Sequence, residues 1–213
     1  MEFQRARTHQ NKEKRWEELI NSTIELFNKF PYSKISLTDI SKKTSFTRAN
    51  IYQYASSKEE IFLKIILKYF VSWIEYLEKK TSGEKDIKLN HFLDIWCDSV
   101  EKNKKLFHLF ILLKFVIEEN VELDPLVKFK AELSCHFKSL QKVIKNCLPA
   151  LSTSDVYRFF NAQYYFAVGV RSVSDPNDLQ FKAHELSNSD YVLPDFYDEY
   201  YDHLKIYLNG LLK

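Results

Sequence analysis

The stretch TRANIYQ, from Thr47 to Gln53, combines side chains that suit contact with a nucleic acid. A threonine at a helix start offers its hydroxyl and free backbone N–H groups to a phosphate, and the helix dipole favours that negative charge. The guanidinium of Arg48 fits a guanine edge or a phosphate. Asn50 and Gln53 lie three residues apart on one exposed face, where their amides can reach adjacent base edges and pair well with adenine. These residues predict a surface that reads the major groove of DNA.

Two tyrosines in the same region, Tyr52 and Tyr54, lie on different faces of the expected helix, so one can contact a phosphate while the other packs inward. Each side chain also has an ordinary structural explanation. Thr47 is a good helix cap, and Arg48 suits a surface salt bridge. The two amides suit a solvated helix face. The residue types alone leave DNA contact and a plain helix surface both open.

Three expected helices position this stretch. Residues 16–30 carry apolar side chains at spacings of three and four, which is typical of an amphipathic helix. Ser36, with an acidic residue three positions later, resembles a capping box that opens a second helix ending near residue 44. A third helix, RANIYQYA at residues 48–55, begins after Thr47 with Ile51 facing inward. Two short helices joined by a tight turn make a helix-turn-helix.

The rest of the chain is also expected to be helical. Only three glycines and five prolines occur among 213 residues, and few segments alternate at the period of a strand. Residues 174–193 are expected to form a long polar loop. Further helices are expected at residues 58–80, 89–102, 104–119, 124–147, 154–173 and 195–212. The fold class is therefore expected to be all-α, with about nine helices.

The charge of the chain is unevenly distributed. Residues 1–58 hold eleven Lys and Arg against six Asp and Glu, a surplus of +5, whereas the whole chain carries +2. The remainder is therefore mildly acidic, at −3. A basic front end suits a polyanionic partner for that part alone, although a solvated tail explains it equally well.

Cysteine spacing and hydropathy indicate the compartment. Cys97, Cys135 and Cys147 are odd in number and widely spaced, unlike a secreted disulfide framework. The polar, basic N-terminus has no apolar stretch behind it and is not a signal peptide. The longest apolar run, residues 106–117, is too short to span a bilayer. We expect a cytoplasmic protein with no membrane partner.

Residues 35–62, ISLTDISKKTSFTRANIYQYASSKEEIF, resemble the N-terminal DNA-binding domain of the TetR family of transcriptional repressors. The match covers roughly residues 14 to 64. The features in register are Leu26-Phe27, Ser36, Asp39-Ile40, Ile51-Tyr52 and Ser57-Lys58-Glu59. Ser45, Ala49 and Ala55 depart from residues common in the family, so no operator sequence can be carried over.

The resemblance implies a DNA-binding domain at residues 1–57 and a ligand-binding and dimerisation domain at residues 58–213. It implies a homodimeric repressor that binds a palindromic operator in double-stranded DNA and is released by a ligand. It also assigns phosphate contacts to Tyr52 and Lys58. The expected DNA-binding residues are Ser36, Thr47, Arg48, Asn50, Tyr52, Gln53 and Lys58.

The second domain is rich in aromatic residues, which form either an ordinary core or a cavity for a small apolar or aromatic effector. Because family members sense small molecules in this domain, the expected pocket residues are Phe92, Trp96, Phe107, Phe110, Phe137, Tyr164 and Tyr165. The last two long helices resemble in position the pair that forms a four-helix bundle between subunits. The expected interface residues are Tyr157, Phe160, Tyr164, Val168, Tyr200, Leu204, Tyr207 and Leu211.

Other classes of function have little support in the sequence. The histidines and cysteines lack compact zinc-ligand spacing, so no metal or other cofactor is expected. A Gly-rich phosphate loop, a G-x-S-x-G elbow and an HExxH motif are all absent from the sequence, so no catalytic residues are expected. Two alternatives to a regulator remain open: a helical protein-interaction module without specific DNA binding, and a small-molecule-binding enzyme.

Overall fold

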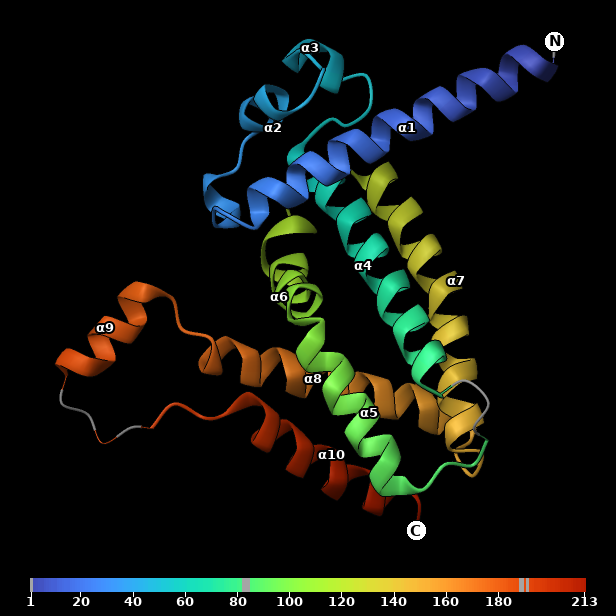
Figure 1. Cartoon of the computed structure of the whole chain (residues 1–213), viewed down its shortest axis with the longest axis vertical. Helices are drawn as coiled ribbons and strands as arrows, with labels where there is room; N and C mark the ends of the chain where they lie inside the picture. The colour runs from blue at the N-terminus through green and yellow to red at the C-terminus, as the bar shows by residue number, and fades with distance from the viewer. Residues whose placement is uncertain (1, 82–84, 188–189, 191) are drawn as a thin grey trace. The chain divides into compact units, whose positions relative to one another are not determined.

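The computed structural model describes residues 2–81, 85–187, 190 and 192–213, with side chains from Asn11 onward. These residues form ten α-helices, one 3₁₀ turn and one π-helical turn, and none of them lies in a strand (Figure 1). The all-α class is therefore confirmed. The described chain divides into two compact units, one containing residues up to Lys68 with Leu113–Glu132, the other Tyr69–Leu112 with Leu133–Lys213. The expected domain division between residues 57 and 58 remains a prediction.

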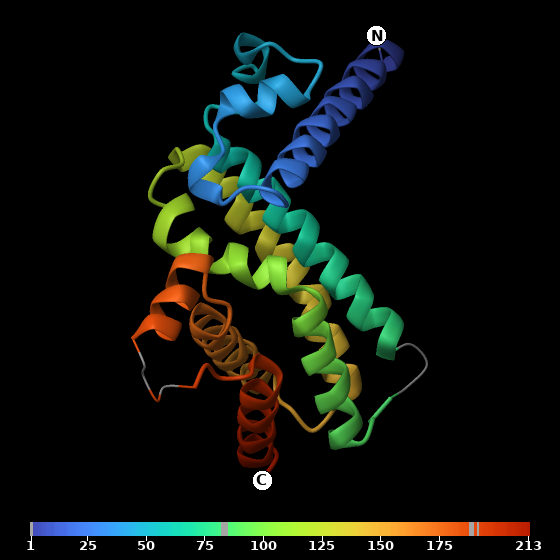
Figure 2. The ribbon, with the colours of Figure 1, turned by 60° about the vertical axis from the view of Figure 1, so that its left-hand side comes forward.

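The first unit contains the helix-turn-helix. Helix α1 (Glu2–Phe27) is followed by the short helices α2 (Leu37–Lys43) and α3 (Arg48–Ile51) and by the start of α4 (Lys58–Thr81). Helix α2 packs against both α1 and α3, and Figure 2 shows α2 next to α1. The apolar stripes of these helices meet in a core whose fully buried side chains include Leu19, Ile40, Ile51, Ile61 and Phe62.

The first and third helices differ in length from the sequence-based expectation. Helix α1 begins at Glu2, because the residues before its apolar stripe include many good helix formers and neither glycine nor proline. Helix α3 ends at Ile51, and residues 52–54 form a turn, so α3 is only four residues long. A helix of this length depends on its surroundings for stability.

The second unit contains α5 (Leu89–Lys102), α6 (Lys104–Leu112), α8 (Thr153–Ser174), α9 (Asp178–Leu186) and α10 (Phe196–Leu211). Helices α4 and α7 (Leu123–Cys147) contribute residues to both units. Helix α10 packs against α8 and α5, as Figure 1 shows for α8. The almost fully buried members of this unit's core include the aromatic residues Trp73, Phe92, Trp96, Phe159 and Tyr200.

Two expectations for the second half of the chain are wrong. The long polar loop contains helix α9, which begins with a reciprocal capping box between Asn177 and Gln180. The helix expected at residues 104–119 changes at Leu113–Ile117 into a π-helical turn, closed by the bond from the Glu118 N–H to the Leu113 carbonyl at 2.9 Å. Single π-helical turns within α-helices are frequent at functional sites.

The indole N–H groups of two tryptophans in this core are paired. The indole N–H of Trp96 donates to the Tyr200 hydroxyl at 2.9 Å, and that of Trp73 donates to the Ser99 hydroxyl at 3.0 Å. Pairing is required because a buried polar group without a partner is costly. These bonds fix the rings of α4, α5 and α10 in one arrangement.

A buried cation joins three helices of the second unit. Arg171 of α8 is 4% exposed, forms ion pairs with Glu101 of α5 and with Asp175 at 3.2 Å, and stacks 3.4 Å from the ring centre of Phe196. A buried guanidinium is tolerated only when it is paired in this way. Arg171 therefore connects α8 to α5 and to the start of α10.

None of the helices in the described chain has the combination of length and apolarity needed to cross a membrane.

Replacing Tyr200 by Phe should lower the free energy of unfolding by about 1–3 kcal/mol, because the Trp96 N–H would then be left unpaired in the core. Urea denaturation measures this change. The control is Tyr165→Phe, since Tyr165 is 65% exposed and its hydroxyl can be replaced by water. Similar stabilities for the two variants would show that the buried hydrogen bond contributes nothing.

Candidate nucleic-acid interface

Helix α2 begins with the capping box that the sequence predicts. The Ser36 hydroxyl accepts the Asp39 N–H at 3.3 Å, and the Asp39 carboxylate accepts the Ser36 N–H at 3.1 Å. Hydrogen bonds from the Ser36 hydroxyl and backbone hold the pKa of Asp39 below its usual value. The start of α2 is thereby fixed with Ser36 exposed.

Thr47 caps α3 as predicted, because its hydroxyl accepts the Asn50 N–H at 3.2 Å. Ile51 is fully buried and anchors the inner face of this short helix. The side chains of Arg48, Asn50 and Gln53 are exposed. The structure therefore brings the predicted base-reading residues together on one free surface around α3.

The two tyrosines near α3 point in opposite directions. Tyr52 is half exposed, and its hydroxyl accepts a hydrogen bond from the Arg48 guanidinium at 3.2 Å. Tyr54 packs edge-on against Trp16 and Phe46, with ring centres 6.3 and 5.4 Å away. Arg48 and Tyr52 thus share the outer surface, whereas Tyr54 is partly buried against Trp16 and Phe46.

Lys58 has a structural role that the sequence did not reveal. Its ammonium donates to the carbonyls of Tyr32 and Ile35 at 3.1 and 2.9 Å and lies 4.1 Å from the Tyr32 ring centre. These contacts hold the segment that leads into α2. An ammonium has three donors, so one remains for the predicted phosphate contact.

Three hydrogen bonds fasten the end of α2 and the following turn to α1, and sequence analysis missed them. The Arg15 guanidinium donates to the Ser45 hydroxyl at 2.8 Å, and the Ser45 N–H donates to the Glu18 carboxylate at 2.6 Å. The Ser22 hydroxyl donates to the Lys43 carbonyl at 3.1 Å. Their only sequence signal is the spacing of polar residues along one side of α1.

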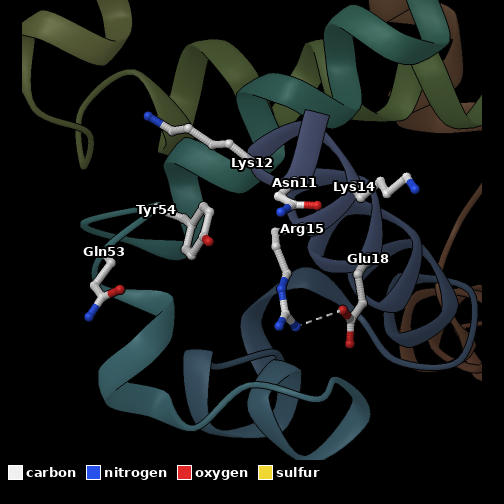
Figure 3. A pocket seen from close by; sticks show the side chains of 7 residues that line it. All are labelled: Asn11, Lys12, Lys14, Arg15, Glu18, Gln53 and Tyr54. Atoms are coloured by element: carbon white, nitrogen blue, oxygen red, sulfur yellow. Dashed lines mark ion pairs between the residues drawn. The ribbon is translucent and has the colours of Figure 1, made fainter. Parts of the chain in front are cut away.

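A groove of about 590 Å³ lies next to this connection (Figure 3). Gln53 and Tyr54 line one side of it, and residues of α1 line the other. The α1 residues are Asn11, Lys12, Lys14, Arg15 and Glu18. Gln53 therefore belongs both to the exposed surface around α3 and to a largely basic groove.

Four of the expected pocket residues, Phe92, Trp96, Phe107 and Phe110, are buried in the core of the second unit. Their rings contact one another or Trp73, as in the Phe92–Trp96 pair at 5.6 Å and the Phe107–Phe110 pair at 5.8 Å. Whether they line a ligand pocket stays a prediction.

The other three expected pocket residues are less uniform. Tyr164 contacts Phe110 at 5.3 Å, and Phe137 contacts Phe160 at 4.8 Å, so both border the aromatic core. Tyr165 is 65% exposed, because it lies on the outer side of α8. The prediction that Tyr165 lines an interior pocket is therefore wrong, because this residue lies on the solvent-facing side of its helix.

Two of the expected interface residues do not lie on the surface of the chain. Tyr200 and Leu204 are fully buried in the same chain, so they belong to the core of the second unit and not to its surface. The reason is that the apolar stripe of α10 faces α8 and α5. Tyr157 is 47% exposed, while the remaining candidates, Phe160, Tyr164, Val168, Tyr207 and Leu211, are partly exposed.

The described residues contain no group of three or more histidines, cysteines or acids that could hold a metal ion. Cys97 and Cys147 are buried free thiols, and Cys135 is an exposed one. Burial raises the pKa of the Cys97 thiol to about 12, which keeps it neutral.

Comparison with known proteins gives two family matches that together span most of the chain. Residues 19–65 match the model described as bacterial regulatory proteins, tetR family. Residues 67–213 match the model described as Tetracyclin repressor-like, C-terminal domain.

Two proteins of related sequence are transcriptional regulators by name. The chain is 24% identical over 139 residues to the biofilm operon icaADBC HTH-type negative transcriptional regulator IcaR of Staphylococcus epidermidis. This match covers 65% of the chain and 63% of IcaR, which is less than two thirds of the length of that protein. It is 28% identical over 138 residues to an uncharacterized HTH-type transcriptional regulator in the lacX 3' region of Lactococcus lactis, covering 64% and 69%. Among solved structures, the TetR family transcriptional regulator PfmR from Thermus thermophilus aligns with 92% of this chain and 99% of its own, at 15% identity and a TM-score of 0.46.

Glu18 should make the stability of the first unit depend on pH. Hydrogen bonds from the Ser45 backbone and hydroxyl, together with Arg15, lower the pKa of Glu18 from its ordinary 4.5. Because the folded pKa is the lower one, this stabilisation is fully present above about pH 4.5 and is lost as the pH falls through the folded value.

Urea denaturation at several pH values compares the wild type with Glu18→Gln, whose amide does not titrate. We expect the wild type to be more stable at neutral pH and the difference to shrink below pH 4.5. Glu17→Gln is the control on the same helix, since Glu17 is exposed. A difference that stays constant with pH would contradict the assigned role of Glu18.

Proposed function

Because the chain belongs to the TetR family of bacterial regulatory proteins, as the resemblance of residues 35–62 predicted, we propose that it is a repressor that binds a palindromic operator as a homodimer and is released by a small ligand. The observation that carries this proposal is the exposed surface of Arg48, Asn50, Tyr52 and Gln53 around the capped helix α3. The name of the IcaR relative, a negative regulator, supports repression over activation. The protein acts in the cytoplasm, where bacterial DNA is accessible.

The DNA contacts divide into positioning and reading contacts. Arg48 grips a guanine edge or a phosphate, and the amides of Asn50 and Gln53 pair with adjacent bases. Phosphates are held by Tyr52 and by the remaining ammonium donor of Lys58. Ser36 and Thr47, at the starts of α2 and α3, also contact phosphates.

Exposed apolar residues in the second unit support the homodimer. Helix α9 has no buried residue, and Leu179, Phe181 and Leu186 are between 49% and 79% exposed. Ile206 of α10 is 74% exposed. Clustered apolar exposure is uncommon on a monomer and marks an interface, and a second copy of the chain is the partner that a palindromic operator requires. The interface then uses the outer faces of α8 and α10 together with α9.

An unpaired amide in the second unit supports a ligand site. Gln163 of α8 is 1% exposed, and neither its amide nitrogen nor its amide oxygen has a hydrogen-bond partner among the described residues. It follows Phe159 by one helical turn, and Phe159 contacts Trp96 at 4.9 Å. A small apolar or aromatic effector with one polar group would satisfy the amide and pack against these rings.

Release follows from a shift of populations. An effector that binds more tightly to the conformation in which the two DNA-binding domains are splayed lowers the DNA affinity by the same coupling factor by which DNA lowers the effector affinity. Helix α4 is the element proposed to move, because it runs without interruption from Lys58 at the helix-turn-helix into the second unit. The protein works through binding alone and not as an enzyme. If an effector left both operator affinity and the separation of the two DNA-binding heads unchanged, this release mechanism would be wrong.

Selection of bound duplexes from a random DNA pool tests the proposed function and yields the operator. With that operator, Arg48→Ala should weaken binding by about 1–3 kcal/mol, because a guanidinium contact to a base is lost. Fluorescence anisotropy of a labelled duplex measures the affinity. Lys145→Ala is the control, because Lys145 is an exposed cation of the second unit.

The selection experiment also separates the proposal from a protein-interaction module. DNA binding through phosphates weakens steeply as salt concentration rises. If the full chain showed no measurable duplex affinity even at low salt, the helix-turn-helix would be purely structural and the repressor proposal would be wrong.

Gln163→Leu should raise the free energy of unfolding of the ligand-free protein by about 1 kcal/mol, because it removes an unpaired buried amide while keeping a side chain of similar size. Operator affinity should stay unchanged. Compounds that release the wild type from DNA should act more weakly on this variant. A variant no more stable than the wild type would show that the amide is already satisfied.

A further inference from the structure

We propose that the basic groove between α1 and the C-terminal end of the helix-turn-helix binds the DNA backbone, with Lys12 and Lys14 as phosphate contacts outside the helix-turn-helix itself. This inference rests on the proposed DNA-binding function. It assigns to α1 a direct role in binding in addition to its role in supporting the turn.

The position of the groove is the first argument. Gln53 lines it and also belongs to the exposed surface around α3 (Figure 3). A DNA strand whose base edge is reached by Gln53 therefore runs beside the residues of α1.

The charge of the groove is the second argument. Among the side chains that the structure describes, its lining includes three cations, Lys12, Lys14 and Arg15, and one carboxylate, Glu18. That carboxylate accepts the Ser45 N–H at 2.6 Å and lies 3.6 Å from the Arg15 guanidinium, so its charge is already compensated. The lining is left with an excess of positive charge, which attracts a polyanion.

The availability of the two lysines is the third argument. Arg15 is committed to Ser45 and stacks 4.9 Å from the ring centre of Phe46. Lys12 and Lys14 are exposed, and within the part of the chain whose side chains are described neither has a hydrogen bond or an ion pair. Figure 3 shows their side chains extending to different sides of α1, so each reaches a different phosphate.

The distribution of acids on α1 is the fourth argument. Glu13 and Glu17 do not line the groove. At 3.6 residues per turn they lie about 160° and about 120° around α1 from Asn11. Their carboxylates therefore lie outside the lining and do not offset its positive charge.

Phosphate contacts position the protein without reading sequence. Each of the two lysines, Lys12 and Lys14, should therefore contribute as much to the affinity for an unrelated duplex as to the affinity for the operator. Each neutralised phosphate contributes about 0.9 to the slope of log affinity against log salt. Removing the two lysines should therefore reduce that slope, while the ratio of operator affinity to the affinity for unrelated DNA should stay the same.

The test uses the full chain and the operator obtained by selection, with anisotropy titrations at several salt concentrations. Lys12→Gln and Lys14→Gln should each reduce the salt slope by about 1, and the double variant by about 2. The matched control is Lys79→Gln with Lys145→Gln, two exposed lysines of the second unit. Thermal unfolding checks that all variants fold alike.

The outcomes separate the inference from the function on which it rests. If Arg48→Ala weakens operator binding while the lysine variants keep the wild-type slope, DNA binding stands and the groove is not part of the interface. If the lysine variants change the preference between operator and unrelated DNA, their contacts are to bases and the phosphate assignment is wrong. If the wild type binds no duplex, the proposed function itself fails.

Discussion

The shortness of helix α3 is the constraint on which the DNA-binding half depends. Four residues cannot hold a helix in water by themselves. Here the Thr47 cap fixes the start, buried Ile51 fixes the inner face, and the bonds from α1 to Ser45 hold the preceding turn. The order of the exposed surface around α3 therefore depends on these three sets of contacts. Helix α1 matters to DNA binding through them even where it touches no base.

The second unit is subject to a different constraint, because its aromatic core encloses polar atoms. The indoles of Trp73 and Trp96 and the guanidinium of Arg171 all have partners. Gln163 does not, although it is as deeply buried. Both polar atoms of this buried amide lack a partner among the described residues, and that is the observation behind the proposed ligand site.

Local signals made much of this fold predictable. The caps at Ser36 and Thr47 and the inward position of Ile51 follow from the residues within one helical turn, and the structure has all three. The capping box at Asn177 carries a similar signal for α9, but the polar residues around it concealed the helix. The face that α10 turns inward depends on α5 and α8, which lie far away in the chain, so no local pattern marks Tyr200 as core.

The contacts of the helix-turn-helix with α1 are nonlocal in the same way. Nothing beside Ser45 in the sequence indicates that Arg15 and Glu18 hold it, and nothing beside Lys58 indicates that it holds the carbonyls of Tyr32 and Ile35. Residue types predicted what the surface around α3 can contact. The hydrogen bonds that hold this surface in place became apparent only from the three-dimensional structure.

The separation between buried and exposed positions in α3 has a consequence for how such a regulator evolves. Ile51 carries the packing, whereas Arg48, Asn50 and Gln53 are exposed. Substitutions at exposed positions usually change stability by no more than about 0.5 kcal/mol. After a gene duplication, a copy of this protein can therefore acquire a new DNA target through a few changes at these positions, while the scaffold that presents them remains the same.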